Sequence, residues 1–274
     1  MTELRTRRLG RTELMVTELG LGAMDTPHSP EAAATIEAAL DAGINFIDTA
    51  REYEGSEFLL GQVIRARGGA DVYLASKTFR HTADGAQRDV DRSLSILGVN
   101  RIALYQLHDI STPEAWAEVM APDGALEGLQ IAQYRGLIDH IGVSTHNTAL
   151  AHEIITSGAF SAVMLEYSAF FTETAPLIDL AVEHDVGVVV MRPVGGSGRT
   201  SNMRRRLSEG YDGLLTPANL LRYVLSNPGV TVAIPGARYP SRIVENVATA
   251  ASLEPMDEAT KRALEAEAAA HFYD

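Results

Sequence analysis

The sequence contains no cysteine and is poor in positive charge. Without cysteine, the chain of 274 residues can form no disulfide framework, thiolate zinc site, iron–sulfur cluster or cysteine nucleophile. Lys and Arg number 23 against 36 Asp and Glu, which gives a formal net charge of −13. Because so acidic a surface repels nucleic-acid phosphates and anionic lipid, the sequence predicts neither a nucleic-acid nor a membrane partner.

Long apolar runs and metal-binding spacings are absent as well. No stretch of about 18 uninterrupted apolar residues occurs, and the charged segment Met1–Arg8 leads into no apolar segment of the signal-peptide type. We therefore expect a soluble, cytoplasmic protein. The histidines show no His-Glu-x-x-His motif and no i,i+4 pair, so no metal site is expected.

Short apolar runs alternate with longer amphipathic stretches along the chain. The runs rich in apolar and β-branched residues are expected to be strands, at Glu18–Gly22, Ile44–Ile47, Val72–Ser76, Ile102–Gln106, Ile138–Val143, Ala162–Glu166, Val186–Met191 and Thr231–Ile234. Helical periodicity predicts helices that include Pro30–Asp41, Ser56–Ala66, Ala83–Leu97, Pro113–Tyr134, Thr172–His184, Pro217–Ser226 and Asp257–Ala270. Apolar strands separated by helices predict a parallel sheet covered on both faces.

Eight strand–helix units in a chain of this length favour a closed (β/α)₈ barrel, the TIM barrel, formed by residues 1–274 as a single domain. A short β-hairpin is predicted to precede it, with Arg7–Leu9 and Leu14–Val16 as its strands. The glycine- and arginine-rich stretch Gly195–Gly213 follows the seventh strand, and we interpret it as a flexible loop. It is either a phosphate-binding loop, as often follows strands 7 and 8 of such barrels, or a plain solvated loop.

Two glycine-rich segments resemble known motifs without matching them. Gly20–Asp25 lacks the third glycine of a dinucleotide-binding turn. Gly195–Arg199 lacks the second glycine of a nucleophile elbow. The sequence therefore predicts neither a Rossmann domain nor a serine hydrolase.

Polar residues end three successive predicted strands. Asp48, Lys77 and His108 are separated by 29 and 31 residues, about one strand–helix unit each. Barrel strands converge at their carboxyl ends on the mouth where barrel active sites lie. Tyr53, in the loop after Asp48, can lie over the same mouth. Each residue alone has a structural explanation, as a cap, a solvated charge or a packing group, but their convergence favours a catalytic function.

These four residue types suit the delivery of a proton. A tyrosine has an ordinary pKa near ~10, and the ammonium group of Lys77 is expected to lower it. Asp48 would keep Lys77 charged and oriented. His108 can hydrogen-bond a substrate oxygen and direct it towards Tyr53, so that a carbonyl group is polarised and protonated.

These motifs, in this order, resemble the aldo-keto reductases. The likeness rests on Phe46–Ala50 with Tyr53 and Gly55-Ser56-Glu57, Ala75–Thr78, Leu107-His108, Ile141–Ser144, Ile234–Arg238 and Glu245-Asn246. The resemblance implies a (β/α)₈ barrel that binds NADP(H) without a Rossmann domain and reversibly reduces aldehydes or ketones to alcohols. It implies Tyr53 as general acid/base, Lys77 and Asp48 as its tuning pair, and His108 as the group that orients the substrate.

The resemblance also assigns cofactor contacts. Ser144 matches the serine that holds the nicotinamide carboxamide, and Glu245 and Asn246 match the pair beside the adenine. Arg238 and Arg242 flank the position expected for the adenosine 2′-phosphate. This favours NADP(H) over NAD(H), because a guanidinium group binds phosphate through two charge-assisted hydrogen bonds. The predicted cofactor site is completed by Met191, Arg192 and Gly236.

The chain departs from the family pattern around the nicotinamide. Thr145 follows Ser144 where the family has Asn, and Met164 stands in place of the usual Gln. His146 or Asn147 could replace the missing hydrogen bonds, or both could cap the next helix. Met191 stands where an aromatic residue often stacks on the nicotinamide, and its thioether can pack on a flat ring.

Two other functions are compatible with these residues. A regulatory or redox-sensing subunit would bind NADP(H) with weak turnover. A different barrel enzyme, such as an isomerase or aldolase, would use Lys77 as a base or Schiff-base nucleophile. The expected partner is a small carbonyl or alcohol substrate, and the residues near strand ends that are candidates for its pocket are Met24, Phe79, Trp116 and Tyr167.

Overall fold

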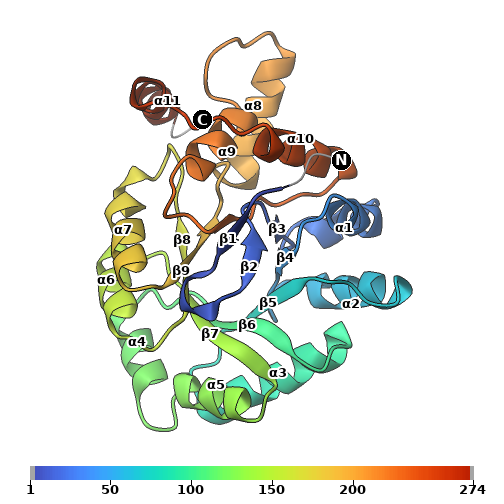
Figure 1. Ribbon diagram of the computed structural model, residues 1–274, viewed down its shortest axis with the longest axis vertical. Coiled ribbons are helices and arrows are strands. Elements are labelled where there is room, and N and C mark those ends of the chain that lie inside the picture. Colours follow the sequence, from blue (N-terminus) through green and yellow to red (C-terminus); the bar gives the residue numbers. More distant parts are fainter. Residues whose placement is uncertain (1–3, 272–274) are drawn as a thin grey trace.

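The computed structural model describes residues 4–271 and shows a ring of parallel strands surrounded by helices (Figure 1). The strands are β3 (Leu21–Gly22), β4 (Phe46–Asp48), β5 (Tyr73–Thr78), β6 (Ile102–Leu107), β7 (Ile138–Ser144), β8 (Ala162–Glu166), β9 (Gly187–Met191) and β10 (Val232–Ala233). Each strand pairs in parallel with its neighbour in the chain. Parallel bridges from Leu19 to Ala233 and from Gly22 to Gly236 connect the first strand to the last. The predicted (β/α)₈ barrel is confirmed.

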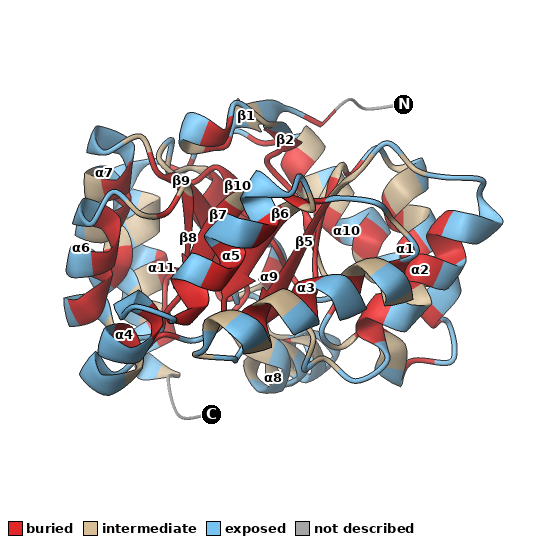
Figure 2. Ribbon diagram, turned by 90° about the horizontal axis from the view of Figure 1, so that it is seen from below, coloured by how far each residue is buried: buried red, intermediate tan, exposed pale blue. Residues whose placement is uncertain are grey.

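Helices cover the outside of the barrel and turn their buried faces towards the strands (Figure 2). They are α1 (Ala32–Asp41), α2 (Ser56–Ala66), α3 (Ala83–Leu97), α4 (Pro113–Met120), α5 (Ala125–Tyr134), α6 (Thr148–Thr156), α7 (Ala175–Glu183), α8 (Gly196–Ser208), α9 (Pro217–Leu225), α10 (Pro240–Ala251) and α11 (Glu258–Ala270). Several begin at a side-chain cap: Thr82, Thr112 and Thr216 each accept a backbone N–H of the first turn. In the part of the chain that the structure describes, no helix is long and apolar enough to cross a membrane.

Two predicted elements differ from the structure. The stretch Pro113–Tyr134 is broken into α4 and α5. Ala121 leaves the helical conformation with ψ of 161°, and Asp123 adopts a left-handed backbone with φ of 62°. A Cβ atom at Gly124 would lie 2.5 Å from the carbonyl oxygen of Val119, so only glycine fits this turn. The interpretation of Gly195–Gly213 as a flexible loop is wrong, since most of it forms α8. This helix begins after the left-handed Gly195 and buries Met203.

The predicted N-terminal hairpin is present and closes one end of the barrel. Strand β1 (Thr6–Arg8) pairs antiparallel with β2 (Met15–Thr17), and Figure 1 shows the hairpin in front of the barrel strands. Leu9 and Val16 are fully buried and pack in one cluster with barrel residues that include Phe46 and Leu104. The hairpin therefore closes the amino-terminal end of the barrel and leaves the carboxyl ends of the strands as its mouth.

The barrel interior changes from apolar to polar towards this mouth. Phe46, Ala75 and Leu104 belong to the inner apolar cluster. Because side chains alternate between the two faces of a strand, the residues two positions further along face the same interior. In β4, β5 and β6 these residues are Asp48, Lys77 and Gln106.

Candidate active site

A buried ion pair forms the floor of the mouth. The Nζ of Lys77 donates to Asp48 Oδ1 at 2.5 Å and to the carbonyl oxygen of Thr49 at 2.9 Å. Gln106 donates to the other oxygen of Asp48 at 3.1 Å. Asp48 and Lys77 are only 2% and 1% exposed. Both oxygens of the carboxylate thus have a donor, which fixes the direction of the lysine.

Tyr53 and His108 lie above this pair. Lys77 Nζ is 3.3 Å from the Tyr53 hydroxyl and 4.7 Å from the centre of its ring. The rings of Tyr53 and His108 meet edge to face, with centroids 5.5 Å apart. The structure therefore brings together all four residues predicted to be catalytic, with the hydroxyl and the imidazole facing the same space.

Burial controls the protonation of this group. Burial raises the pKa of the Tyr53 hydroxyl. The negative charges of Asp48 and Glu52 raise it further, and the positive charge of Lys77 lowers it by less than these effects together. The prediction that Lys77 brings the tyrosine below its ordinary pKa is therefore wrong for the net shift. For Lys77 itself, burial lowers the pKa, but Asp48 and Tyr53 raise it by more. At neutral pH the site holds a protonated tyrosine beside a charged lysine.

Glu52, which the sequence analysis did not select, faces His108. Its Oε2 lies 3.3 Å from His108 Nδ1, and its Oε1 accepts the backbone N–H of Phe79 at 3.3 Å. The Phe79 ring stacks on the imidazole, with centroids 4.0 Å apart and an interplanar angle of 20°. Burial alone would raise the pKa of Glu52, but the hydrogen bonds from His108 and Phe79 lower it below its usual value. Its place next to Tyr53 in the sequence was the only indication that Glu52 belongs to the site.

A cavity of about 1000 Å³ extends from these residues to α8 and α10. Tyr53, Asp48 and His108 line it, and Lys77 lies beneath them. The predicted cofactor and substrate residues that line it are Ser144, Met191, Arg192, Gly236, Arg238, Arg242, Asn246, Met24 and Phe79. Glu245 is not among the lining residues. It pairs with Arg242 and Arg204, each at 2.7 Å, and so orients two arginines that do line the cavity.

The far end of the cavity suits a polyanion. Gly196 and Ser197 line it in the first turn of α8, whose backbone N–H groups have no acceptor inside the helix. Asp25 bonds to the hydroxyl of Ser197 and lies 3.5 Å from Arg238. The loop after β3 is thereby connected to both α8 and the loop after β10.

The end of the cavity near Ser144 holds the residues at which the chain departs from the family pattern. Asn147 is the cap of α6, because its Oδ1 accepts the N–H of Leu150 at 3.1 Å, and it is not a lining residue. His146 does line the cavity. Ser144 Oγ accepts the N–H of Asp109 at 2.8 Å, which leaves its own hydroxyl proton available to a ligand. Met164 lines the wall close by.

Two predicted substrate residues do not line the cavity. Trp116 lies on the buried face of α4, outside the barrel, where its Nε1 donates to Glu153 at 2.7 Å. Tyr167 packs against Tyr223, with ring centroids 5.5 Å apart. The assignment of both residues to the substrate pocket is wrong, because nearness to a strand end does not determine which face a side chain occupies.

The chain is a TIM barrel with a tyrosine, a lysine, an aspartate and a histidine at its mouth, beside an arginine-rich cavity. Residues 18–214 match the aldo/keto reductase family, and the chain belongs to this family.

Known relatives agree with this assignment. An uncharacterized oxidoreductase, YqkF of Bacillus subtilis, is 25% identical over 90% of this chain and 91% of its own length. Among solved structures, the holo form of aldo-keto reductase AKR11C1 from Bacillus halodurans has a TM-score of 0.81, with 23% identity and 96% of each chain covered. An aldo-keto reductase from Klebsiella pneumoniae, solved in complex with NADPH, has a TM-score of 0.75 and 22% identity, covering 97% of this chain and 95% of its own. At these identities the two structures show the shared fold.

Proposed function

We propose that this protein is an NADPH-dependent reductase of aldehydes or ketones that also works in the direction of alcohol oxidation. The observation that carries the proposal is the contact of the Tyr53 hydroxyl with Lys77, itself paired with Asp48, at the mouth of the barrel. Support comes from the arginines at the far end of the same cavity and from the NADPH complex of the Klebsiella relative.

The lining residues fit NADP(H) along the whole cavity. Arg238 and Arg242 would hold the 2′-phosphate, and the first turn of α8 would face the pyrophosphate. Ser144 and Met191 would contact the nicotinamide. When bound, NADPH supplies the hydride that reduces the carbonyl carbon.

The chain's own residues would supply the proton and the orientation. Tyr53 donates its hydroxyl proton to the carbonyl oxygen as the carbon is reduced. Lys77 stabilises the phenolate that remains, and Asp48 keeps the ammonium group aimed at it. His108 positions the substrate oxygen near Tyr53. In alcohol oxidation the same tyrosine, as phenolate, takes up the proton of the hydroxyl group.

The proposal is tested first by titrating the protein with NADPH and with NADH, following the fluorescence of the reduced nicotinamide. NADPH-selective binding, followed by turnover of a panel of aldehydes and ketones, is the expected result. Binding without turnover would favour the redox-sensing alternative. No binding of either nucleotide would refute the reductase proposal.

Replacing Arg238 and Arg242 together by Met should weaken NADPH binding by at least about a hundredfold and NADH binding only slightly. Each lost charge-assisted hydrogen bond to the 2′-phosphate is worth about 1.5–3 kcal/mol. Dissociation constants from the same titration measure the effect. Arg262→Met, an exposed residue of α11, removes a charge outside the cavity and is the matched control. Equal losses for both nucleotides would place the 2′-phosphate elsewhere.

The two reaction directions should respond differently to pH. Because the pKa of Tyr53 is raised above its ordinary value of about 10, the protonated donor persists through the neutral and mildly alkaline range. Carbonyl reduction should therefore not lose kcat/KM through tyrosine ionisation between about pH 7 and 9, whereas alcohol oxidation should rise about tenfold per pH unit as the phenolate fraction grows. Profiles of kcat/KM in both directions test this, and oxidation that is flat with pH would contradict it.

A further inference from the structure

The charged side chains that line the cavity are separated by sign. The described cations that line it are on the β9–β10 side, at Arg192, Arg199, Arg204, Arg238 and Arg242. On the opposite side, after β4 and β6, the charges are the carboxylates of Glu52 and Asp109. The remaining two lining carboxylates are already matched, because Asp48 pairs with Lys77 and Asp25 lies near Arg238. The end of the cavity where substrate would react is therefore acidic.

Glu52 presents its charge at the point where a substrate would enter. It comes directly before Tyr53, lines the cavity, and its side chain is 33% exposed. The N–H of Phe79 and the imidazole of His108 fix the positions of its two oxygens. The carboxylate is thus held at the mouth instead of turning out to solvent.

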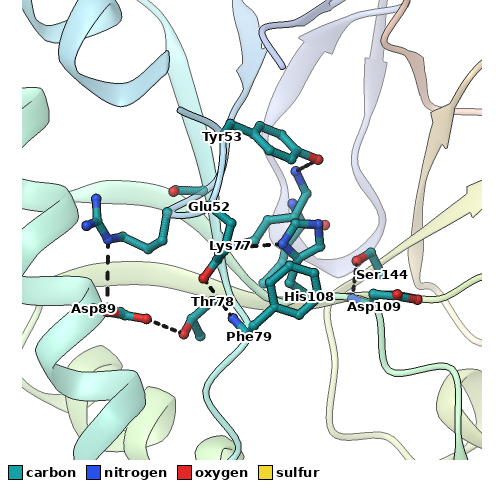
Figure 3. A network of polar contacts seen from close by, with 12 residues as sticks. Glu52, Tyr53, Lys77, Thr78, Phe79, Asp89, His108, Asp109 and Ser144 are labelled. Atoms are coloured by element: carbon teal, nitrogen blue, oxygen red, sulfur yellow. Dashed lines mark hydrogen bonds and ion pairs between the residues drawn. The ribbon is translucent and has the colours of Figure 1, made fainter. Parts of the chain in front are cut away.

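Asp109 lies on the other side of His108 from Glu52 (Figure 3). Its backbone has φ of 56° and its N–H is held by Ser144, so the residue is fixed in place although it is exposed. Its carboxylate accepts the hydroxyl of Ser111. Within residues 4–271 no Lys, Arg or His forms an ion pair with it, so its negative charge is not neutralised by a neighbour.

Phe79 adds a surface that suits a cation. The residue is 43% exposed and lines the cavity, and its ring stacks on the imidazole of His108. The face of an aromatic ring attracts ammonium groups, and quaternary ammonium ions in particular. An aromatic ring and two carboxylates that line the same cavity are a combination that binds such groups and repels anions.

We propose that the substrate is a carbonyl compound that carries an ammonium group, and that Glu52 and Asp109 select it over carbonyl compounds that carry a carboxylate. This inference rests on the proposed reductase function and specifies its substrate class. The two carboxylates attract the cationic substituent while the carbonyl group lies against Tyr53 and His108, and they repel an anionic substituent in the same position.

Three benzaldehydes that differ in charge at one position test the proposal. They carry, in the para position, a trimethylammoniomethyl, a neopentyl or a carboxymethyl group. The first two have nearly the same shape, and the methylene group limits electronic effects on the aldehyde. With NADPH, the wild-type protein should show a kcat/KM for the ammonium aldehyde at least about tenfold above that for the carboxylate, with the neopentyl compound between them. The ratio should fall as salt is added.

Variants assign the selectivity to the two residues. Glu52→Gln and Asp109→Asn should each reduce the ammonium-to-carboxylate ratio severalfold, and the double variant should bring it close to one. Asn tolerates the left-handed backbone of residue 109, so this variant tests the proposal even if Glu52→Gln folds poorly. The ratio within one variant cancels any general loss of activity from a disturbed His108. Glu54→Gln, with the same charge change outside the cavity, should leave the ratio as in wild type.

Two results would overturn the inference in different ways. Reduction of the neopentyl compound with equal rates for the two charged ones, or a ratio that neither variant changes, would refute charge selection and leave the reductase proposal standing. Failure of the wild-type protein to reduce any of the three would refute the reductase proposal and this inference with it.

Discussion

Tyr53→Phe should lower the turnover of carbonyl substrates by about a thousandfold, in the range expected for loss of a positioned general acid. The phenylalanine ring keeps the edge-to-face contact with His108 and the contact with Lys77, whose Nζ lies 4.7 Å from the ring centre. Only the hydroxyl, 3.3 Å from Lys77, is lost. The affinity for NADPH should therefore remain within about twofold of wild type, since no charged group of the cavity is removed.

Steady-state kinetics and the nucleotide titration measure these two effects separately. Tyr134→Phe removes a hydroxyl from a side chain that is 94% exposed and serves as the matched control. If Tyr53→Phe retained activity comparable with wild type, another group would have to supply the proton. If it lost NADPH binding as well, the hydroxyl would have a structural function and the kinetic result would say nothing about proton transfer.

The sequence was sufficient to predict where Asp48 and Lys77 lie because their positions follow from regular geometry. Asp48 and Lys77 lie two residues beyond the buried Phe46 and Ala75, and alternation along a strand points all four side chains into the barrel. Parallel pairing then brings neighbouring strand ends together. No long-range information beyond the barrel itself was needed for this part of the site.

The same reasoning failed for features that depend on tertiary packing and burial. Tyr167 directly follows the inward-facing Glu166 and so points to the other face of the strand, where it meets Tyr223. The sequence did not predict helix α8, because the segment is rich in glycine and arginine, a composition typical of a loop. The direction of the Tyr53 pKa shift depends on burial, which exceeds the effect of the lysine that the sequence does reveal.

Lys77→Met should lower the free energy of unfolding by about 3–5 kcal/mol, because it leaves the carboxylate of Asp48 buried without its ionic partner. The hydrogen bond from Gln106 remains but carries no charge. Urea unfolding measures the loss. The double variant Asp48→Asn, Lys77→Met removes both charges and should recover a large part of it, so a double variant that is less stable than Lys77→Met would contradict the explanation.

The cost of Lys77→Met should also depend on pH in a definite direction. Burial already raises the pKa of Asp48 in the wild-type protein, and Lys77 is the main group that opposes this rise. Without Lys77, the folded variant holds a carboxyl whose pKa is further above its unfolded value of about 3.9, so the folded state binds more protons than the unfolded state as pH falls. Stability of the variant relative to wild type should therefore improve from pH 8 towards about pH 5. A stability difference that stays constant over this range would show that the loss comes from packing around the lysine stem and not from the uncompensated charge of Asp48.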